Sequence, residues 1–375
     1  MERTRRISEL DGLRGAAVIM VLAWHFIGSM VDRSAGQLED FLHAATIFGR
    51  TGVDLFFVLS GFLIIGIIVD NRRAPNFFRV FYTRRAWRIY PPYAALIVAY
   101  WACYGLAGES PGFNTDYGAG LQLFAQVTFL WNWLMAFTNG PVARAFSVTW
   151  SVAIEEWFYL TFPLMLWVLP KRWIVPALIA VGAGSALLRA GAAVMFPPGL
   201  APYVLPMFRL DGLCIGGLLA MAYRAPTVWE ALRLRRRAIG TSGALFAASL
   251  PLIIALSRDD ILRQMYLWGH AYLSLGYAVV LAAVLLNLGS VWLSPLRWRP
   301  AIWAGTISYT LYLFHPLFIS LYFELAGRPE LVTSLNDAFI AGMALLTAAA
   351  FSVCFYWLVE RPALGRGAQA RYAAG

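Results

Sequence analysis

Long apolar segments separated by short basic clusters set the strongest limit on what this chain can fold into. Apolar runs of about 18 residues or more are typical of bilayer-spanning helices. We expect ten spans, at residues 10–31, 48–69, 90–107, 147–169, 174–196, 206–223, 238–256, 265–288, 301–324 and 333–357. The sequence therefore predicts an all-α, polytopic membrane bundle, formed as a single domain over residues 1–375 with no appended soluble domain.

The charge pattern fits the same class. The formal net charge is +10, but only 13% of the residues are charged, against about a quarter in soluble domains. Basic residues cluster in short stretches between apolar runs, which is typical of cytoplasmic loops, so we expect no nucleic-acid partner. Three distant cysteines and four histidines without ligand-type spacing predict neither a disulfide framework nor a metal site.

One further apolar stretch, residues 121–137, lies at the lower length limit for crossing a membrane. If it does not cross and the N-terminus is cytoplasmic, most basic residues fall in inner loops, as the positive-inside rule requires. We therefore expect both termini in the cytoplasm. Residues 121–137 then form a re-entrant or interfacial helix inside an outer region, residues 108–146.

Ionisable side chains within membrane spans are costly, so each is a candidate functional group. Counting 1.5 Å per residue places one group of them in the outer part of the bilayer. These are His25, Asp54, Glu155, Glu156, Arg209, Asp211 and His315, with Arg189 beside them. A second group lies towards the cytoplasm, formed by Arg14, Arg84, Arg85 and Arg88. We expect one cavity to join the two groups.

His25 is the candidate general base, because the pKa of histidine lies near neutrality. Arg14 and His25 are eleven residues apart, which places them on one helix face about 16 Å apart along its axis. Glu155 is the candidate orienting partner of His25. The alternatives are a packed hydrogen bond for His25 and a salt bridge from the paired glutamates to Arg189 or Arg209.

The cytoplasmic arginines suggest a phosphate site. Arg84 and Arg88 are four residues apart and share a helix face. Guanidinium groups bind phosphate with two parallel hydrogen bonds. The alternative is an anchor that contacts lipid headgroups. No serine-nucleophile elbow or glycine-rich phosphate loop accompanies the cluster, so the sequence supports neither a covalent serine enzyme nor a nucleotide-driven pump.

Seven motifs follow one another in a recognisable order: Glu9–Ala16 with His25, Gly52–Phe62, Phe81–Pro91, Trp150–Tyr159, Arg209–Gly212, Ser308–Pro316 and Glu360–Pro362. In these motifs the chain resembles the acyltransferase type 3 family of membrane O-acyltransferases. The resemblance implies that His25 and Arg14 are needed for activity and that Arg84 and Arg88 bind the phosphates of coenzyme A. Trp157 departs from the glutamine that is common at this position of the family.

The resulting expectation is a membrane O-acyltransferase in a bacterial plasma or inner membrane. The donor is acyl-CoA, with acetyl-CoA as the default, and Arg84, Arg85 and Arg88 bind it. The acceptor is a hydroxyl of an extracytoplasmic carbohydrate or related molecule, with Asp54, Glu156, Arg209, Asp211 and His315 as acceptor-side candidates. A separate partner transferase can complete the reaction. The alternatives are a transporter of a small anion or sugar and a non-catalytic membrane scaffold.

Overall fold

The computed structural model describes residues 7–107, 117–138, 143–197, 199–256 and 261–373. Every regular element within these ranges is helical, which confirms the all-α prediction. Helical stretches occupy each of the ten segments in which a span is expected. They are α1 (Ser8–Ala23) with η1 (Trp24–Gly28), α3 (Gly52–Asn71), α4 (Phe77–Ala107), α7 (Thr149–Val168), α8 (Ile174–Met195), α10 (Leu210–Tyr223), α12 (Arg236–Leu256), η6 (Met265–Gly269) with α14 (His270–Leu286), α15 (Arg299–Leu325) and α16 (Leu335–Phe355).

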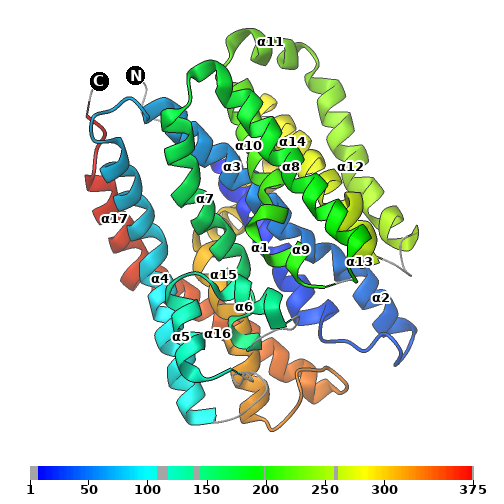
Figure 1. Cartoon of the computed structure of the whole chain (residues 1–375). Coiled ribbons are helices and arrows are strands. Elements are labelled where there is room, and N and C mark those ends of the chain that lie inside the picture. The colour runs from blue at the N-terminus through cyan, green and yellow to red at the C-terminus, as the bar shows by residue number, and fades with distance from the viewer. Residues whose placement is uncertain (1–6, 108–116, 139–142, 198, 257–260, 374–375) are drawn as a thin grey trace.

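Shorter elements connect these helices. They are α2 (Gln37–Thr46), η2 (Ile47–Thr51), α5 (Ala119–Val127), α6 (Trp131–Thr138), η3 (Arg144–Phe146), η4 (Lys171–Trp173), α9 (Ala201–Val204), η5 (Pro206–Phe208), α11 (Pro226–Leu234), α13 (Ile261–Gln264), η7 (Val291–Arg297), η8 (Tyr356–Glu360) and α17 (Arg361–Gln369). In Figure 1, α1, α3 and α15 lie towards the middle of the bundle. The last element, α17, lies at its edge beside α4.

By length and apolarity, five helical stretches of the described chain qualify as membrane-crossing. They are Ser8–Gly28, Gln37–Asn71, Lys171–Met195, Leu262–Leu286 and Leu335–Gln369. The protein is therefore a multi-pass membrane protein. A count of ten spans and the cytoplasmic position of both termini stay predictions.

The stretch 121–137 does not form one continuous helix. It falls into α5 and α6, with Phe129 between them in the left-handed backbone region at φ 56°. Helices of 9 and 8 residues extend about 14 and 12 Å, well short of a hydrocarbon core of about 30 Å. Neither helix can cross the membrane, and their position on the outer side stays a prediction.

Close helix packing at glycines holds the centre of the bundle together. A Cβ added to Gly305 in α15 would lie 1.9 Å from the carbonyl oxygen of Asp11 in α1. A Cβ on Gly61 in α3 would lie 1.9 Å from the carbonyl oxygen of Leu213 in α10. Small residues allow this backbone approach in membrane helices. As a result α1 packs directly on α15, and α3 packs directly on α10.

Candidate active site

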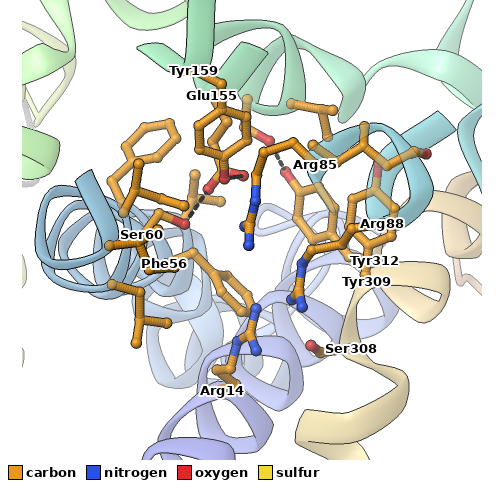
Figure 2. A pocket seen from close by; sticks show the side chains of 18 residues that line it. Arg14, Phe56, Ser60, Arg85, Arg88, Glu155, Tyr159, Ser308, Tyr309 and Tyr312 are labelled. Carbon is orange, nitrogen blue, oxygen red and sulfur yellow. Dashed lines mark hydrogen bonds between the residues drawn. The ribbon is translucent and has the colours of Figure 1, made fainter. Parts of the chain in front are cut away.

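The first interior cavity, which we call the arginine cavity, has a volume of about 170 Å³. Its walls come from α1, α3, α4, α7 and α15 (Figure 2). Arg14 of α1 and Arg85 and Arg88 of α4 direct their guanidinium groups into it. Among the described residues, no carboxylate forms an ion pair with any of these three. The cavity therefore holds three guanidinium groups, none of which is in direct ion-pair contact with a carboxylate of the described chain.

Arg84 is not part of this cavity, contrary to the expected grouping with Arg85 and Arg88. Its Nε atom donates a hydrogen bond to the carbonyl oxygen of Ala370 at 2.9 Å. Its guanidinium group also lies 5.1 Å from the ring centre of Tyr372. Sequence spacing correctly placed these arginines near one another on α4, but the segment after α17 engages the Arg84 side chain. Arg14 takes its place in the cavity.

Glu155 faces the arginines across the same cavity (Figure 2). Its carboxylate accepts hydrogen bonds from the hydroxyls of Ser60, at 2.6 Å, and Tyr159, at 3.0 Å. The expected contact with His25 is not found. Glu155 lies in the first half of α7. The long arginine side chains extend towards the middle of the bundle and so come to face it. The depth count therefore assigned Glu155 to the wrong group of residues.

Glu156 points elsewhere. It is partly buried, lines neither of the two cavities that hold the candidate catalytic residues, and its buried Oε1 atom has no hydrogen-bond partner among the described residues. The alternative of a salt bridge from Glu155 or Glu156 to Arg189 or Arg209 is also wrong. Both arginines have other partners.

Those partners form a buried ionic network. Arg209 pairs with Asp54 at 2.9 Å, and Asp54 also contacts Nδ1 of His270 at 3.2 Å. Arg189 pairs with Asp211 at 2.7 Å. Buried charges need such partners, so the network accounts structurally for Asp54, Arg209 and Asp211. His270 escaped the sequence analysis, although an imidazole near the start of an apolar segment was the available signal.

The second cavity, which we call the histidine cavity, has a volume of about 450 Å³ and is lined by His25. His25 lies in η1, a π-helical turn of a kind often found at functional sites. Its Nδ1 atom is 2.9 Å from the carbonyl oxygen of Val21. A carbonyl can only accept, so Nδ1 carries the hydrogen and the neutral ring keeps a lone pair on Nε2. The backbone, not a carboxylate, orients the base.

The structure does bring His25 and His315 together. Their ring centres are 4.8 Å apart in an edge-to-face arrangement, with an interplanar angle of 62°. His315 is fully buried, and its Nδ1 atom contacts the carbonyl oxygen of Leu311 at 3.2 Å. Two imidazoles with the same backbone anchoring therefore form an edge-to-face pair next to the histidine cavity.

The arginines and His25 line two different cavities, which share no lining residue. A single cavity that joins them stays a prediction. Tyr312 forms part of the boundary. It lines the arginine cavity, and its ring centre lies 5.9 Å from that of His315. Its hydroxyl contacts the Ser151 hydroxyl at 2.7 Å. Tyr312 and His315 thus separate the arginines from His25.

The sequence analysis missed the hydroxyl-bearing residues of the arginine cavity, among them Ser60, Tyr309 and Tyr312. All three belong to the motifs Gly52–Phe62 and Ser308–Pro316. A polar hydroxyl inside an apolar span was the signal that could have identified them, because such a group needs a partner in a membrane. Within the described ranges, no group of three or more His, Cys, Asp or Glu side chains is arranged to hold a metal ion.

The fold defines a multi-pass, membrane-embedded helical protein. Its interior holds one basic cavity and a second cavity lined by an imidazole. Residues 7–358 match the acyltransferase domain family, and the chain belongs to this family. Its relatives include the peptidoglycan O-acetyltransferase OatA of Listeria monocytogenes, 26% identical over 86% of this chain and 51% of the relative. Another is the O-acetyltransferase OatA of Staphylococcus aureus, 26% identical over 99% of this chain and 59% of the relative.

The chain thus spans about half the length of the curated relatives that it matches. No solved structure matches it.

Proposed function

We propose that this protein transfers an acetyl group from cytoplasmic acetyl-CoA to a hydroxyl group of a carbohydrate on the outer side of a bacterial plasma membrane. The proposal is carried mainly by one observation. Arg14, Arg85 and Arg88 direct three guanidinium groups into one interior cavity, and none of them has an ion-pair partner in the described part of the chain. Unpaired charge in an apolar interior is costly, so an anionic ligand is the natural partner.

In the proposed complex, Arg85 and Arg88 hold phosphates of coenzyme A at the arginine cavity. The thioester arm extends past Arg14 along α1 towards His25. Eleven residues of helix separate the two, a distance of about 16 Å along the axis. Because Tyr312 and His315 stand between the cavities, Tyr312 must turn aside for the thioester to reach His25.

The chemistry then needs one base. Nε2 of His25 removes the proton from the acceptor hydroxyl, and the hydroxyl oxygen attacks the thioester carbonyl carbon. The new C–O bond forms, the C–S bond breaks, and the coenzyme A thiolate leaves and takes up a proton. Two serines, Ser29 and Ser147, line the histidine cavity with His25. Direct transfer is preferred because, within the described residues, neither hydroxyl is hydrogen-bonded to a ring nitrogen of His25 that could activate it. An acetyl-His25 intermediate is the second route.

The name of the Listeria monocytogenes relative supports a peptidoglycan-type glycan as the acceptor. Membership of an acyltransferase family favours this reaction over the transport of a small anion or sugar. Because the matched relatives are longer, a separate transferase that receives the acetyl group and completes the transfer is compatible with the proposal.

The test uses the full chain in proteoliposomes, with radiolabelled acetyl-CoA on one side and cell-wall glycan on the other. The wild type should form labelled glycan and free coenzyme A, whereas His25→Ala should form neither. Glycan labelling by His25→Ala at the wild-type rate would overturn the mechanism. Solute uptake by the wild type without consumption of acetyl-CoA would instead support the transporter.

A further inference from the structure

We propose that Glu330 and Arg144 form a recognition site for the acceptor, which binds neighbouring hydroxyl groups of an uncharged sugar ring beside His25. This inference rests on the proposed function. It concerns residues outside the family motifs, on the connection between α15 and α16 and on the element η3 that precedes α7.

Glu330 and Arg144 lie beside the candidate base. Glu330, Arg144 and His25 line the same histidine cavity of about 450 Å³, together with the hydroxyls of Ser29 and Ser147. A space of this size is within the range of small-molecule sites. The candidate base and two oppositely charged groups therefore share one open space.

The Glu330 carboxylate is anchored through one oxygen atom, while its other oxygen atom is only loosely paired. Its Oε1 atom accepts a hydrogen bond from the Ser320 hydroxyl at 2.7 Å, which holds the carboxylate in place. Its Oε2 atom lies 3.7 Å from NH1 of Arg144. Charge-assisted hydrogen bonds are about 2.7–2.9 Å long, so this pair is too far apart to satisfy either group fully. Oε2 and the guanidinium group keep capacity for a ligand between them.

The burial of Glu330 is consistent with this interpretation. The Glu330 side chain is 18% exposed, whereas that of Arg144 is 53% exposed. Burial raises the pKa of Glu330, although its contacts with Ser320 and Arg144 oppose the shift. A carboxylate with this little solvent contact gains from a hydroxyl that replaces lost water.

A backbone hydrogen bond links the segment of Glu330 to the segment of His25. The backbone N–H of Val332 donates a hydrogen bond to the carbonyl oxygen of Met30 at 2.7 Å. One residue before Met30, Ser29 donates its hydroxyl hydrogen to the carbonyl oxygen of His25 at 3.0 Å. The segment that holds Glu330 is thereby fastened to the segment that holds the base. Such fixed spacing favours one bound orientation of an acceptor hydroxyl.

The chemistry of the pair indicates the class of ligand. A carboxylate only accepts hydrogen bonds, a guanidinium only donates them, and a sugar hydroxyl does both. Their charges oppose each other, so the site has no strong net charge with which to attract a polyanion. We therefore assign an uncharged, hydroxyl-rich ring to the site, rather than a phosphate or a carboxylate ligand on Arg144 alone.

The experiment compares chitopentaose, an uncharged glycan, with inorganic phosphate as probes. Binding to the detergent-purified full chain is measured by saturation-transfer NMR and by calorimetry. Glu330→Gln keeps the shape of the side chain but removes its charge, and Arg144→Gln removes the charged guanidinium group of its partner. Glu39→Gln in α2 is the matched control, because that residue lies outside both cavities.

We expect Glu330→Gln and Arg144→Gln each to weaken chitopentaose binding about 10-fold or more, the typical effect of losing a charged hydrogen-bond partner. Acetyl-CoA affinity should not change in either variant, and Glu39→Gln should behave as the wild type. Unchanged chitopentaose affinity with a lowered melting temperature would show a structural ion pair and overturn the proposal.

Two other results would also overturn it. One is absence of chitopentaose binding to the wild type, and the other is phosphate binding that only Arg144→Gln abolishes. Neither would refute acetyl transfer, which the His25→Ala assay tests separately. Conversely, if the protein proved not to transfer acetyl groups, the comparison of glycan binding between the variants would still be valid.

Discussion

The arginines of α4 provide the sharpest test of the donor site, because neighbouring residues on one helix are expected to behave differently. Arg85 and Arg88 point into the arginine cavity, whereas Arg84 is held by Ala370 and Tyr372. Arg79 is exposed earlier on the same helix. We predict that Arg85→Gln and Arg88→Gln weaken coenzyme A binding strongly, that Arg84→Gln weakens it little, and that Arg79→Gln has no effect.

The magnitude follows from the bonds that are lost. A hydrogen bond to a charged group contributes about 1.5–3 kcal/mol. At 1.4 kcal/mol per tenfold change, each cavity arginine should be worth about a 10- to 150-fold change in Kd. Screening by water should reduce the effect of Arg79→Gln to near zero, because exposed ionic contacts contribute about 0–1 kcal/mol.

The assay is isothermal titration of coenzyme A into the purified full chain, which separates binding from turnover. A melting curve for each variant serves as the folding control. Dephospho-coenzyme A lacks one phosphate. With this ligand, the Kd of the variant whose arginine contacts that phosphate should differ less from the wild-type Kd. The reasoning is refuted if Arg84→Gln costs as much affinity as Arg88→Gln, or if both cavity variants bind as the wild type does.

Three further predictions concern the base and the bundle. His25→Gln should abolish glycan acetylation but retain coenzyme A binding by calorimetry, because His25 lies outside the arginine cavity; loss of both would indicate misfolding. Asp54→Asn should lower stability by about 3–5 kcal/mol in thermal or denaturant unfolding, because it leaves Arg209 buried without its counter-ion; Asp70→Asn, in an exposed pair with Arg224, should cost less than about 1 kcal/mol. Gly61→Ala should cost about 1–3 kcal/mol by overpacking against Leu213, whereas Gly184→Ala, with no neighbour within 4 Å, should be neutral or stabilising.

The helices were predictable because their signal is one-dimensional. Apolar length alone identifies a segment such as α3, and each segment in which a span was expected is helical. The start of α4 was not predictable in this way. It begins at Phe77, well before the expected span at 90–107, because arginines are good helix formers and charge does not end a helix.

The candidate site was only partly predictable, because depth along a helix does not determine which neighbour a side chain meets. Arg14, Arg85 and Arg88 share a cavity, and His25 meets His315, as residues of the same predicted layers. Glu155 and Arg84 were assigned to the wrong neighbours. The partners of Asp54 depend on how α3 packs against α10 and α14, which no spacing within one segment encodes.

The partition made by Tyr312 and His315 has a consequence for the cell as well as for the reaction. The arginine cavity and the histidine cavity share no lining residue, and the side chains of Tyr312 and His315 are packed between them. If the proposed transfer of an acetyl group takes place here, the acyl chain crosses a packed layer and not an open pore. Such a layer would limit the leak of ions during transfer, so that acetylation of the envelope would not have to dissipate the membrane potential.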